Sequence, residues 1–188
     1  MFIVGLDPGK KQDPAALCTL RTTEGPYHLV DLIRFPLMTS YTDLTDTVVQ
    51  YVRHPKLKSP TLVIDVGGVG EAVRDAVAKD VETTVGVMTG GTMRGYFDPD
   101  TWTWYVAKSD IVEGFQVGLM SGQIKVASSL SLAPDLIKEL QSFRRNILPS
   151  GYVSYEHRTP EGHGDLAMAA AMCFGYAQLA RQQRRSAS

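Results

Sequence analysis

The segment Leu62-Val63-Ile64-Asp65-Val66 constrains the fold of this chain more than any other. Its apolar residues follow one another without alternation, which is typical of a strand that is buried on both faces. The turn Gly67–Gly70 leads into a helical segment that reaches about Ala78, and a second apolar run follows at Thr83–Val87. A strand, a helix and a strand in this order place the two strands parallel in one sheet. The sequence therefore predicts an α/β fold.

Asp65 interrupts this apolar run with a carboxyl group. A buried carboxylate without a partner costs several kcal/mol, or it takes up a proton and becomes neutral. A basic partner, hydrogen bonds or a metal ion must therefore compensate for it. This makes Asp65 a candidate functional residue on physical grounds alone.

The remaining segments surround this unit with further strands and helices. A meander of antiparallel strands is predicted at Met1–Leu6, Ala15–Leu20 and Tyr27–Phe35. Helices are predicted over Leu44–Val52 with Thr42 or Asp43 as the cap, from Ser109 to Gly122, over Leu132–Ile147 and over Asp165–Ala180. We also expect a long loop over residues 88–107, a short strand at Ile124–Ala127 and one arm of a β-hairpin at Gly151–Arg158.

Length and composition are those of one ordinary globular domain. The chain has 188 residues, of which 44% are hydrophobic, and a formal net charge of −1. We expect a single domain over residues 1–188, with a frayed tail from about residue 181. Cys18 and Cys173 are expected to be reduced core residues. There is no stretch of the ~20 apolar residues that a membrane span needs, so no membrane partner is expected.

Asp7 and Asp165 each have a structural alternative to a functional role. Asp7 opens an Asp-Pro-Gly turn, and Asp165 stands where an aspartate commonly caps a helix. Asp7 and Asp65, however, both stand at the end of a predicted core strand, where open α/β sheets place their sites. If the first and fourth strands are neighbours, as in RNase H-like sheets, these two carboxylates converge. Asp165 then supplies a third from a helix that lies on the sheet.

Three converging carboxylates repel one another unless cations neutralise them. Ligation by oxygen alone favours hard ions, so two Mg²⁺ or Mn²⁺ ions are the expected cofactors. Two such ions about 4 Å apart can activate a water molecule and stabilise the leaving oxygen in phosphodiester hydrolysis. The predicted chemistry is therefore nuclease chemistry without a side-chain nucleophile.

Three motifs in order resemble the nuclease domain of the large terminase subunit of tailed bacteriophages. They are Gly5-Leu-Asp-Pro-Gly9, Val63-Ile-Asp-Val-Gly-Gly-Val-Gly70 and Gly162-His-Gly-Asp-Leu-Ala167, and the segment Lys108–Phe143 is similar as well. The resemblance covers nearly the whole chain. It implies an RNase H-like mixed sheet of five or more strands, flanked by helices, with an additional β-hairpin before the last helix. It also implies a metal-dependent endonuclease that cuts double-stranded DNA during viral genome packaging.

The resemblance also implies roles for single residues. Asp7 would bridge both ions, while Asp65 and Asp165 would each complete one. Asp13 is a possible accessory acid, or a structural loop residue before Pro14, and His163 belongs to the last motif. Many relatives carry two successive acids after that histidine; Gly164 stands in place of the first, which leaves any fourth carboxylate in doubt.

The implied partners are double-stranded DNA, an ATPase motor domain or chain, the portal protein and the small terminase subunit. The implied location is the cytoplasm of the infected bacterial host. The sequence has no Gly-x-x-x-x-Gly-Lys-Ser/Thr phosphate loop, so the motor would be an excised domain or a separate chain.

Basic residues near the predicted site are the candidates for DNA contact. Lys10 and Lys11 are favoured because they lie beside Asp7. Arg94, Lys108 and Arg158 are further candidates, and each is equally well explained as an ordinary solvated charge. Trp102 and Trp104 suit either stacking on bases or packing on the domain.

Other functions remain open at this point. A Holliday-junction resolvase shares the expected fold and acidic site. A DNA-docking domain with negligible activity in isolation is a second alternative. A fragment of an actin-like ATPase or sugar kinase also begins with a strand and an Asp-x-Gly turn, but it needs a second, similar domain that 188 residues cannot supply.

Overall fold

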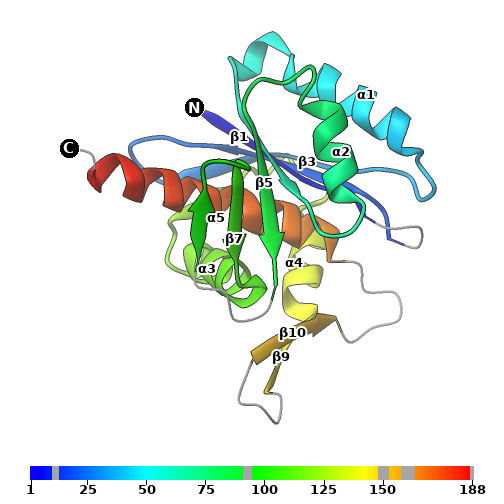
Figure 1. The fold of residues 1–188 in the computed structure, drawn as a ribbon. Coiled ribbons are helices and arrows are strands. Elements are labelled where there is room, and N and C mark those ends of the chain that lie inside the picture. Colours follow the sequence, from blue (N-terminus) through cyan, green and yellow to red (C-terminus); the bar gives the residue numbers. More distant parts are fainter. Residues whose placement is uncertain (10–12, 91–94, 148–152, 158–163, 187–188) are drawn as a thin grey trace.

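A mixed eight-stranded sheet forms the centre of the protein in the computed structural model (Figure 1). The structure describes residues 1–9, 13–90, 95–147, 153–157 and 164–186. The strands of the sheet are β1 (Phe2–Asp7), β2 (Ala16–Arg21), β3 (Tyr27–Arg34), β4 (Thr61–Asp65), β5 (Thr84–Thr89), β6 (Tyr96–Asp98), β7 (Thr103–Val106) and β8 (Ile124–Val126). Their order across the sheet is β6-β7-β5-β4-β1-β2-β3-β8.

Helices and one separate hairpin complete the fold. The helices are α1 (Tyr41–Val52), the short 3-10 helix η1 (Pro55–Leu57), α2 (Gly70–Val77), α3 (Lys108–Met120), α4 (Ala133–Ser142) and α5 (Asp165–Ser186). The hairpin consists of β9 (Phe143–Ile147) and β10 (Val153–His157), which pair antiparallel apart from the main sheet. The hairpin before the last helix is therefore confirmed.

Strand β1 lies at the junction between two kinds of pairing. It pairs antiparallel with β2, which in turn pairs antiparallel with β3, so the predicted meander is confirmed. On its other side β1 pairs parallel with β4, and β4 pairs parallel with β5. The predicted parallel β-α-β unit is thus β4-α2-β5, and the first and fourth strands are neighbours.

The two faces of the sheet carry two separate cores. Figure 1 shows α1 and α2 on one side of the sheet and α5 with α3 on the other. Val4 and Leu6 of β1 pack in the cluster with α1 and α2, whereas Ile3 packs in the cluster with α3, α4 and α5. Successive side chains of a strand point to opposite faces. The parity of β1 therefore assigns its odd-numbered residues to the α5 side.

Helix α5 approaches the sheet closely because both elements present small residues. A Cβ atom at Gly5 would lie 2.3 Å from the backbone oxygen of Ala169 and 2.7 Å from Sγ of Cys173. Cys173 itself is buried and unbridged, and its thiol donates to the backbone oxygen of Cys18 at 3.5 Å. The expectation that an alanine-rich helix packs closely on the sheet is confirmed, and both cysteines lie in the core as expected.

Replacing Gly5 with alanine is expected to destabilise the protein by about 1–3 kcal/mol, because the added methyl group overpacks this contact. Urea unfolding followed by circular dichroism measures the change. Gly114 in α3 is the matched control, because a Cβ atom there meets nothing within 4 Å. Gly114→Ala should be neutral or stabilising by up to about 1 kcal/mol. Equal stabilities of Gly5→Ala and the parent protein would contradict the close packing of α5 on β1.

The prediction of a long loop over residues 88–107 is wrong. Strand β7 pairs parallel with β5, and β6 pairs antiparallel with β7, so this segment widens the sheet. Trp104 on β7 is buried in the core, whereas Trp102 is 55% exposed and precedes the strand with a φ of 49°. Strands of three or four residues are too short to show a hydrophobic period, which explains the error.

Two helix boundaries also differ from the predictions. Helix α4 ends at Ser142, and residues 143–147 form β9, although the helical spacing continues to Ile147. Phe143 still packs in the same core after the chain becomes extended, so apolar spacing alone does not reveal the change. The cap of α1 is Ser40, whose Oγ accepts the Asp43 N–H at 3.1 Å, and not Thr42 or Asp43.

Helix α5 continues to Ser186, past the predicted end at Ala180. Its first ten residues are buried against the sheet, whereas residues 181–185 are exposed. Among the described residues, no helix combines the length and the apolar character that crossing a membrane requires.

Candidate active site

The carboxyl ends of β1 and β4 lie side by side, and each strand ends on an aspartate. Leu6 of β1 is in register with Ile64 of β4, so Asp7 and Asp65 follow at the same edge of the sheet. Val63 of β4 packs in the cluster with α5, which by strand parity puts Asp65 on that side. Asp7 is assigned to the same side by the parity of β1. Both carboxylates therefore stand at the end of the sheet that the start of α5 covers.

Asp7 also forms the turn that its sequence predicts. Its Oδ1 accepts the Gly9 N–H at 3.1 Å, and Gly9 has a φ of +65°. This hydrogen bond uses one lone pair of the carboxylate, so the turn does not exclude a second function.

The turn after Asp65 depends on glycine. Asp65 Oδ1 accepts the Gly67 N–H at 2.8 Å. A Cβ atom at Gly70 would lie 1.7 Å from the backbone oxygen of Asp65, so only glycine fits where α2 begins. Gly70 therefore permits the close packing of β4 against the start of α2. The chain leaves β4 tightly and keeps the Asp65 side chain at the edge of the sheet.

Asp165 is the first residue of α5 and is 7% exposed. The first intrahelical bond runs from the Met168 N–H to the Gly164 oxygen at 2.8 Å, so Gly164 stands at the cap position. Within the described parts of the chain, Oδ2 of Asp165 is a buried oxygen that accepts no hydrogen bond. A buried acceptor without a donor is costly. Because Gly164 and not Asp165 stands at the cap position of α5, helix capping does not explain the buried oxygen of Asp165.

Burial and neighbouring carboxylates raise the pKa values of Asp7 and Asp165. Burial and the nearby charge of Asp65 raise the pKa of Asp7 to about 7. Burial raises the pKa of Asp165 to about 8, and the charges of Asp7, Glu139 and Asp13 contribute to this. Asp7 therefore lies within electrostatic reach of both Asp65 and Asp165.

Two further predicted residues lie within electrostatic reach of Asp7. The Lys108 ammonium lowers the pKa of Asp7, and its Nζ lies 5.6 Å from the centroid of the Phe143 ring. Asp13 is exposed, and its charge acts on both Asp7 and Asp165. The candidates Lys10, Lys11, Arg94, Arg158 and His163 lie outside the described residues.

Glu139 and Arg34 are neighbours of the site that the sequence analysis did not single out. Glu139 of α4 is 6% exposed, forms an ion pair with Arg34 at the end of β3, and accepts the Ala167 N–H at 2.9 Å. Burial raises the pKa of Glu139, while the Ala167 N–H and the Arg34 guanidinium act to lower it. The signal was available: Glu139 stands at a helical interval from Leu136, on the apolar face of α4.

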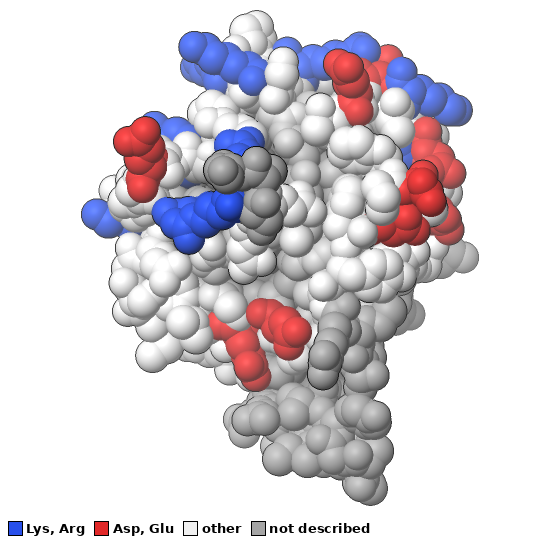
Figure 2. Space-filling view, turned by 60° about the vertical axis from the view of Figure 1, so that its left-hand side comes forward, with Lys and Arg blue, Asp and Glu red and all other residues white. Residues whose placement is uncertain are grey.

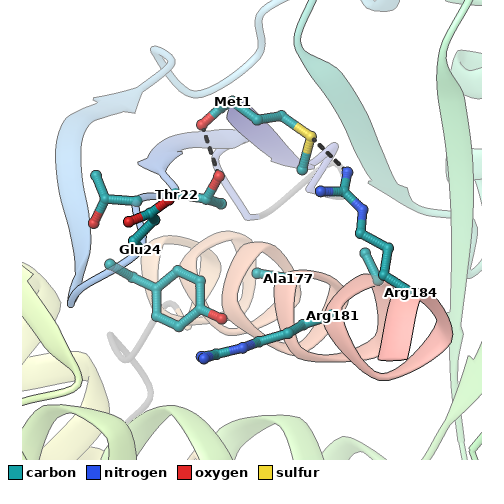
Figure 3. A pocket seen from close by; sticks show the side chains of 9 residues that line it. Met1, Thr22, Glu24, Ala177, Arg181 and Arg184 are labelled. Atoms are coloured by element: carbon teal, nitrogen blue, oxygen red, sulfur yellow. Dashed lines mark hydrogen bonds between the residues drawn. The ribbon is translucent and has the colours of Figure 1, made fainter. Parts of the chain in front are cut away.

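A pocket at the opposite edge of the sheet is separate from these carboxylates. It has a volume of about 300 Å³ and lies at the start of β1, lined by Met1, Thr22, Arg181 and Arg184 among others (Figure 3). Arg184 donates to the Met1 sulfur at 3.7 Å. Strand β1 thus has this pocket at its start and Asp7 at its end.

Charge is mixed on the face of the molecule that Figure 2 shows. Lys and Arg side chains lie mainly along its upper rim and its left side, and Asp and Glu side chains lie along its right side and lower part. This distribution agrees with the net charge of −1. On this face, contact with a polyanion would have to depend on local groups of basic residues.

The groups at this site that could bind a metal ion are carboxylates. In the parts of the chain that the structure describes, no three His, Cys, Asp or Glu side chains converge closely enough to hold one ion together. Asp7 nevertheless interacts with Asp65 and with Asp165, and the second of these has a buried oxygen free of hydrogen bonds. Carboxylate oxygens are ligands that suit hard divalent cations.

The mixed sheet, with β1 between an antiparallel and a parallel neighbour and helices on both faces, is an RNase H-like α/β fold. Solved structures of large terminase nucleases share it. The nuclease of the large terminase from thermophilic phage G20c with bound magnesium is 18% identical, with a TM-score of 0.68 over 93% of this chain and 80% of that chain. The nuclease domain of the large terminase g2p from bacteriophage SPP1 with bound Mn is 16% identical, with a TM-score of 0.55 over 94% of this chain and 86% of that chain.

A longer protein contains the same fold as one part. A large terminase from another thermophilic bacteriophage is 11% identical, with a TM-score of 0.65 over 95% of this chain but only 40% of that chain. No family model and no curated protein matches the chain. The chain therefore has the fold of large terminase nuclease domains, as its three motifs predict.

Proposed function

We propose that this protein is a divalent-metal-dependent endonuclease that cleaves double-stranded DNA during viral genome packaging. The observation that supports this most is the group of Asp7, Asp65 and Asp165 at one edge of the sheet, with Asp7 interacting with both others. The terminase nucleases with bound magnesium or Mn share the fold of this chain. The site has no need of a side-chain nucleophile.

Each aspartate has its own part in this proposal. Asp7 would contribute to both ion positions, and Asp65 and Asp165 would each contribute to one. Two Mg²⁺ or Mn²⁺ ions held by these residues would activate a water molecule and stabilise the charge on the leaving oxygen. The buried oxygen of Asp165 would gain the partner that it lacks among the described residues.

The surroundings of the carboxylates raise their affinity for protons and place a positive charge beside them. Asp7 and Asp165 hold protons to unusually high pH because burial disfavours their charged forms. Ion binding would therefore release protons, and affinity would rise with pH. Lys108 offers a positive charge beside Asp7 for a DNA phosphate. Contacts of this kind position the duplex but carry no sequence information, so little base preference is expected.

The biological setting is proposed from the likeness to terminases. The longer large terminase, of which this chain spans 40%, suggests that this domain works beside an ATPase motor, as a second domain or a separate chain. The portal protein and the small terminase subunit would be further partners. The reaction would then take place in the cytoplasm of the infected bacterium.

Cleavage of supercoiled plasmid DNA tests the proposed activity. With Mn²⁺ or Mg²⁺ the protein should convert the plasmid to nicked and linear forms, and EDTA should stop the reaction. Asp65→Asn should be inactive, whereas Asp80→Asn, on the exposed Arg53–Asp80 pair, should cleave as the parent does. Unchanged cleavage by Asp65→Asn would overturn the proposed site.

The same assay separates the alternatives. Cleavage of four-way junctions in preference to linear duplex would identify a resolvase. DNA binding without cleavage under any metal condition would identify a docking domain. The described residues offer no observation that favours either of these.

A further inference from the structure

The first turn of α5 lacks a capping side chain of its own. The first four N–H groups of a helix have no partner within the helix, and a side chain at the cap position usually accepts one of them. Here the cap position is held by Gly164, which has no side chain. The residue that follows, Asp165, is the one that the proposed function needs in a fixed place.

A carboxylate from another helix takes over the missing cap. Oε2 of Glu139, on α4, accepts the Ala167 N–H at 2.9 Å, and the Leu166 N–H also interacts with this carboxylate. Both N–H groups belong to the first turn of α5. Glu139 is 6% exposed, so this contact is shielded from water.

Arg34 holds the Glu139 carboxylate in turn. Nη2 of Arg34 forms an ion pair with the other oxygen of Glu139, Oε1. Arg34 is the last residue of β3, so its backbone is fixed in the sheet. The pair therefore connects the sheet to α4 and, through the Ala167 N–H, to the start of α5.

We infer that Glu139 is a positioning residue: its carboxylate oxygen caps α5 from α4 and so fixes the direction in which Asp165 meets Asp7. The inference rests on the proposed function, because it assigns Glu139 to the support of the same carboxylate site. Glu139 does not itself hold an ion in this scheme, since one oxygen accepts the Ala167 N–H and the other faces Arg34. Groups that orient metal ligands commonly change metal affinity by about 10–100-fold when they are removed.

Two variants of nearly equal size distinguish the effect of the hydrogen bond from Ala167 from the effect of the negative charge of Glu139. Glu139→Gln keeps an oxygen that can accept the Ala167 N–H, and Glu139→Met keeps the length but has no such acceptor. Both remove the same negative charge. Mn²⁺ affinity is measured without DNA, by calorimetry and by electron paramagnetic resonance of the free ion. Glu139→Gln should stay within about threefold of the parent, and Glu139→Met should bind at least about tenfold more weakly.

General loss of stability is controlled by a variant in the other core. Leu44→Ala opens a cavity between α1 and the opposite face of the sheet, where it lowers stability without touching the carboxylates. It should bind Mn²⁺ as the parent does. Hydrogen exchange at Ala167 provides a second readout: the exchange rate should rise in Glu139→Met and stay near the parent value in Glu139→Gln.

The outcomes distinguish failure of this inference from failure of the proposed function. If the parent binds Mn²⁺ and Asp165→Asn does not, but Glu139→Met binds as tightly as Glu139→Gln, the positioning role is overturned and the metal site stands. If the parent and Asp165→Asn bind Mn²⁺ equally, the proposed site is wrong, and the positioning role falls with it. Weaker binding in Glu139→Met than in Glu139→Gln, with Leu44→Ala unchanged, supports the inference.

Discussion

Replacing Asp165 with asparagine is expected to reduce metal-dependent cleavage by at least about a hundredfold and to make the metal-free protein more stable. The two effects have opposite signs because they come from the same carboxylate. Removing one ligand from the proposed site removes several kcal/mol of transition-state stabilisation, and 1.36 kcal/mol corresponds to about tenfold in rate. Asparagine also removes the free-energy cost of ionising a buried carboxyl group, whose pKa is raised to about 8 by burial and by Asp7.

The gain in stability is expected to be on the order of a few kcal/mol at pH 8, since asparagine is neutral at every pH. Cleavage is measured on supercoiled plasmid, and stability by urea unfolding in EDTA. Asp80→Asn is the matched control, because Asp80 pairs with Arg53 on the surface, and exposed pairs contribute about 0–1 kcal/mol. A variant that is both inactive and less stable than the parent would show that Asp165 is a structural residue and not a strained ligand.

The second large effect is a fall in the stability of the metal-free protein as the pH rises from about 5 to about 8. The folded pKa values of Asp7 and Asp165 are about 7 and about 8, against an ordinary aspartate pKa of 3.8. In this window the folded state therefore binds more protons than the unfolded state, and stability decreases with rising pH. Most proteins with paired carboxylates show the opposite slope in the acidic part of this range.

Divalent ions should reverse that slope. Ions that bind the ionised carboxylates favour the folded state, and their effect grows as the protons leave. The rise in Tm on adding Mn²⁺ should therefore be larger at pH 8 than at pH 5.5. The double variant Asp7→Asn/Asp165→Asn should show neither the fall with pH nor the rise with Mn²⁺. A parent protein whose metal-free stability is flat or increasing between pH 5 and 8 would contradict the raised pKa values.

The strands of the sheet could be predicted from the sequence wherever their burial requires a long or periodic pattern of apolar residues. The apolar run around Val63 predicted a buried parallel strand, and β4 is one, between β1 and β5. The segment around Trp104 could not be recognised in the same way, because β7 has only four residues and gains its burial from β5 and from α5. Short strands at the margin of a sheet are defined by their partners more than by their own composition.

The sequence singles out the candidate aspartates but not the residues that lie near them. Asp65 stood out because a carboxylate inside an apolar run is costly, and its convergence with Asp7 followed from a neighbouring pair of strands that the structure contains. Arg34 and Glu139 are 105 positions apart in the sequence, and only the packing of α4 between β3 and α5 brings them together. No local pattern shows that a glycine before Asp165 would leave α5 to be capped from another helix.

The order in which the chain supplies the three aspartates has a consequence for biosynthesis. Asp7 and Asp65 belong to strands that are complete early, whereas Asp165 opens α5, which follows all the other described elements. A growing chain whose segment from Asp165 onward is still inside the ribosome lacks α5, and with it the third carboxylate and the cover of the central strands. The proposed nuclease would thus remain inert while the sheet is being made and acquire its activity only when α5 closes over β1.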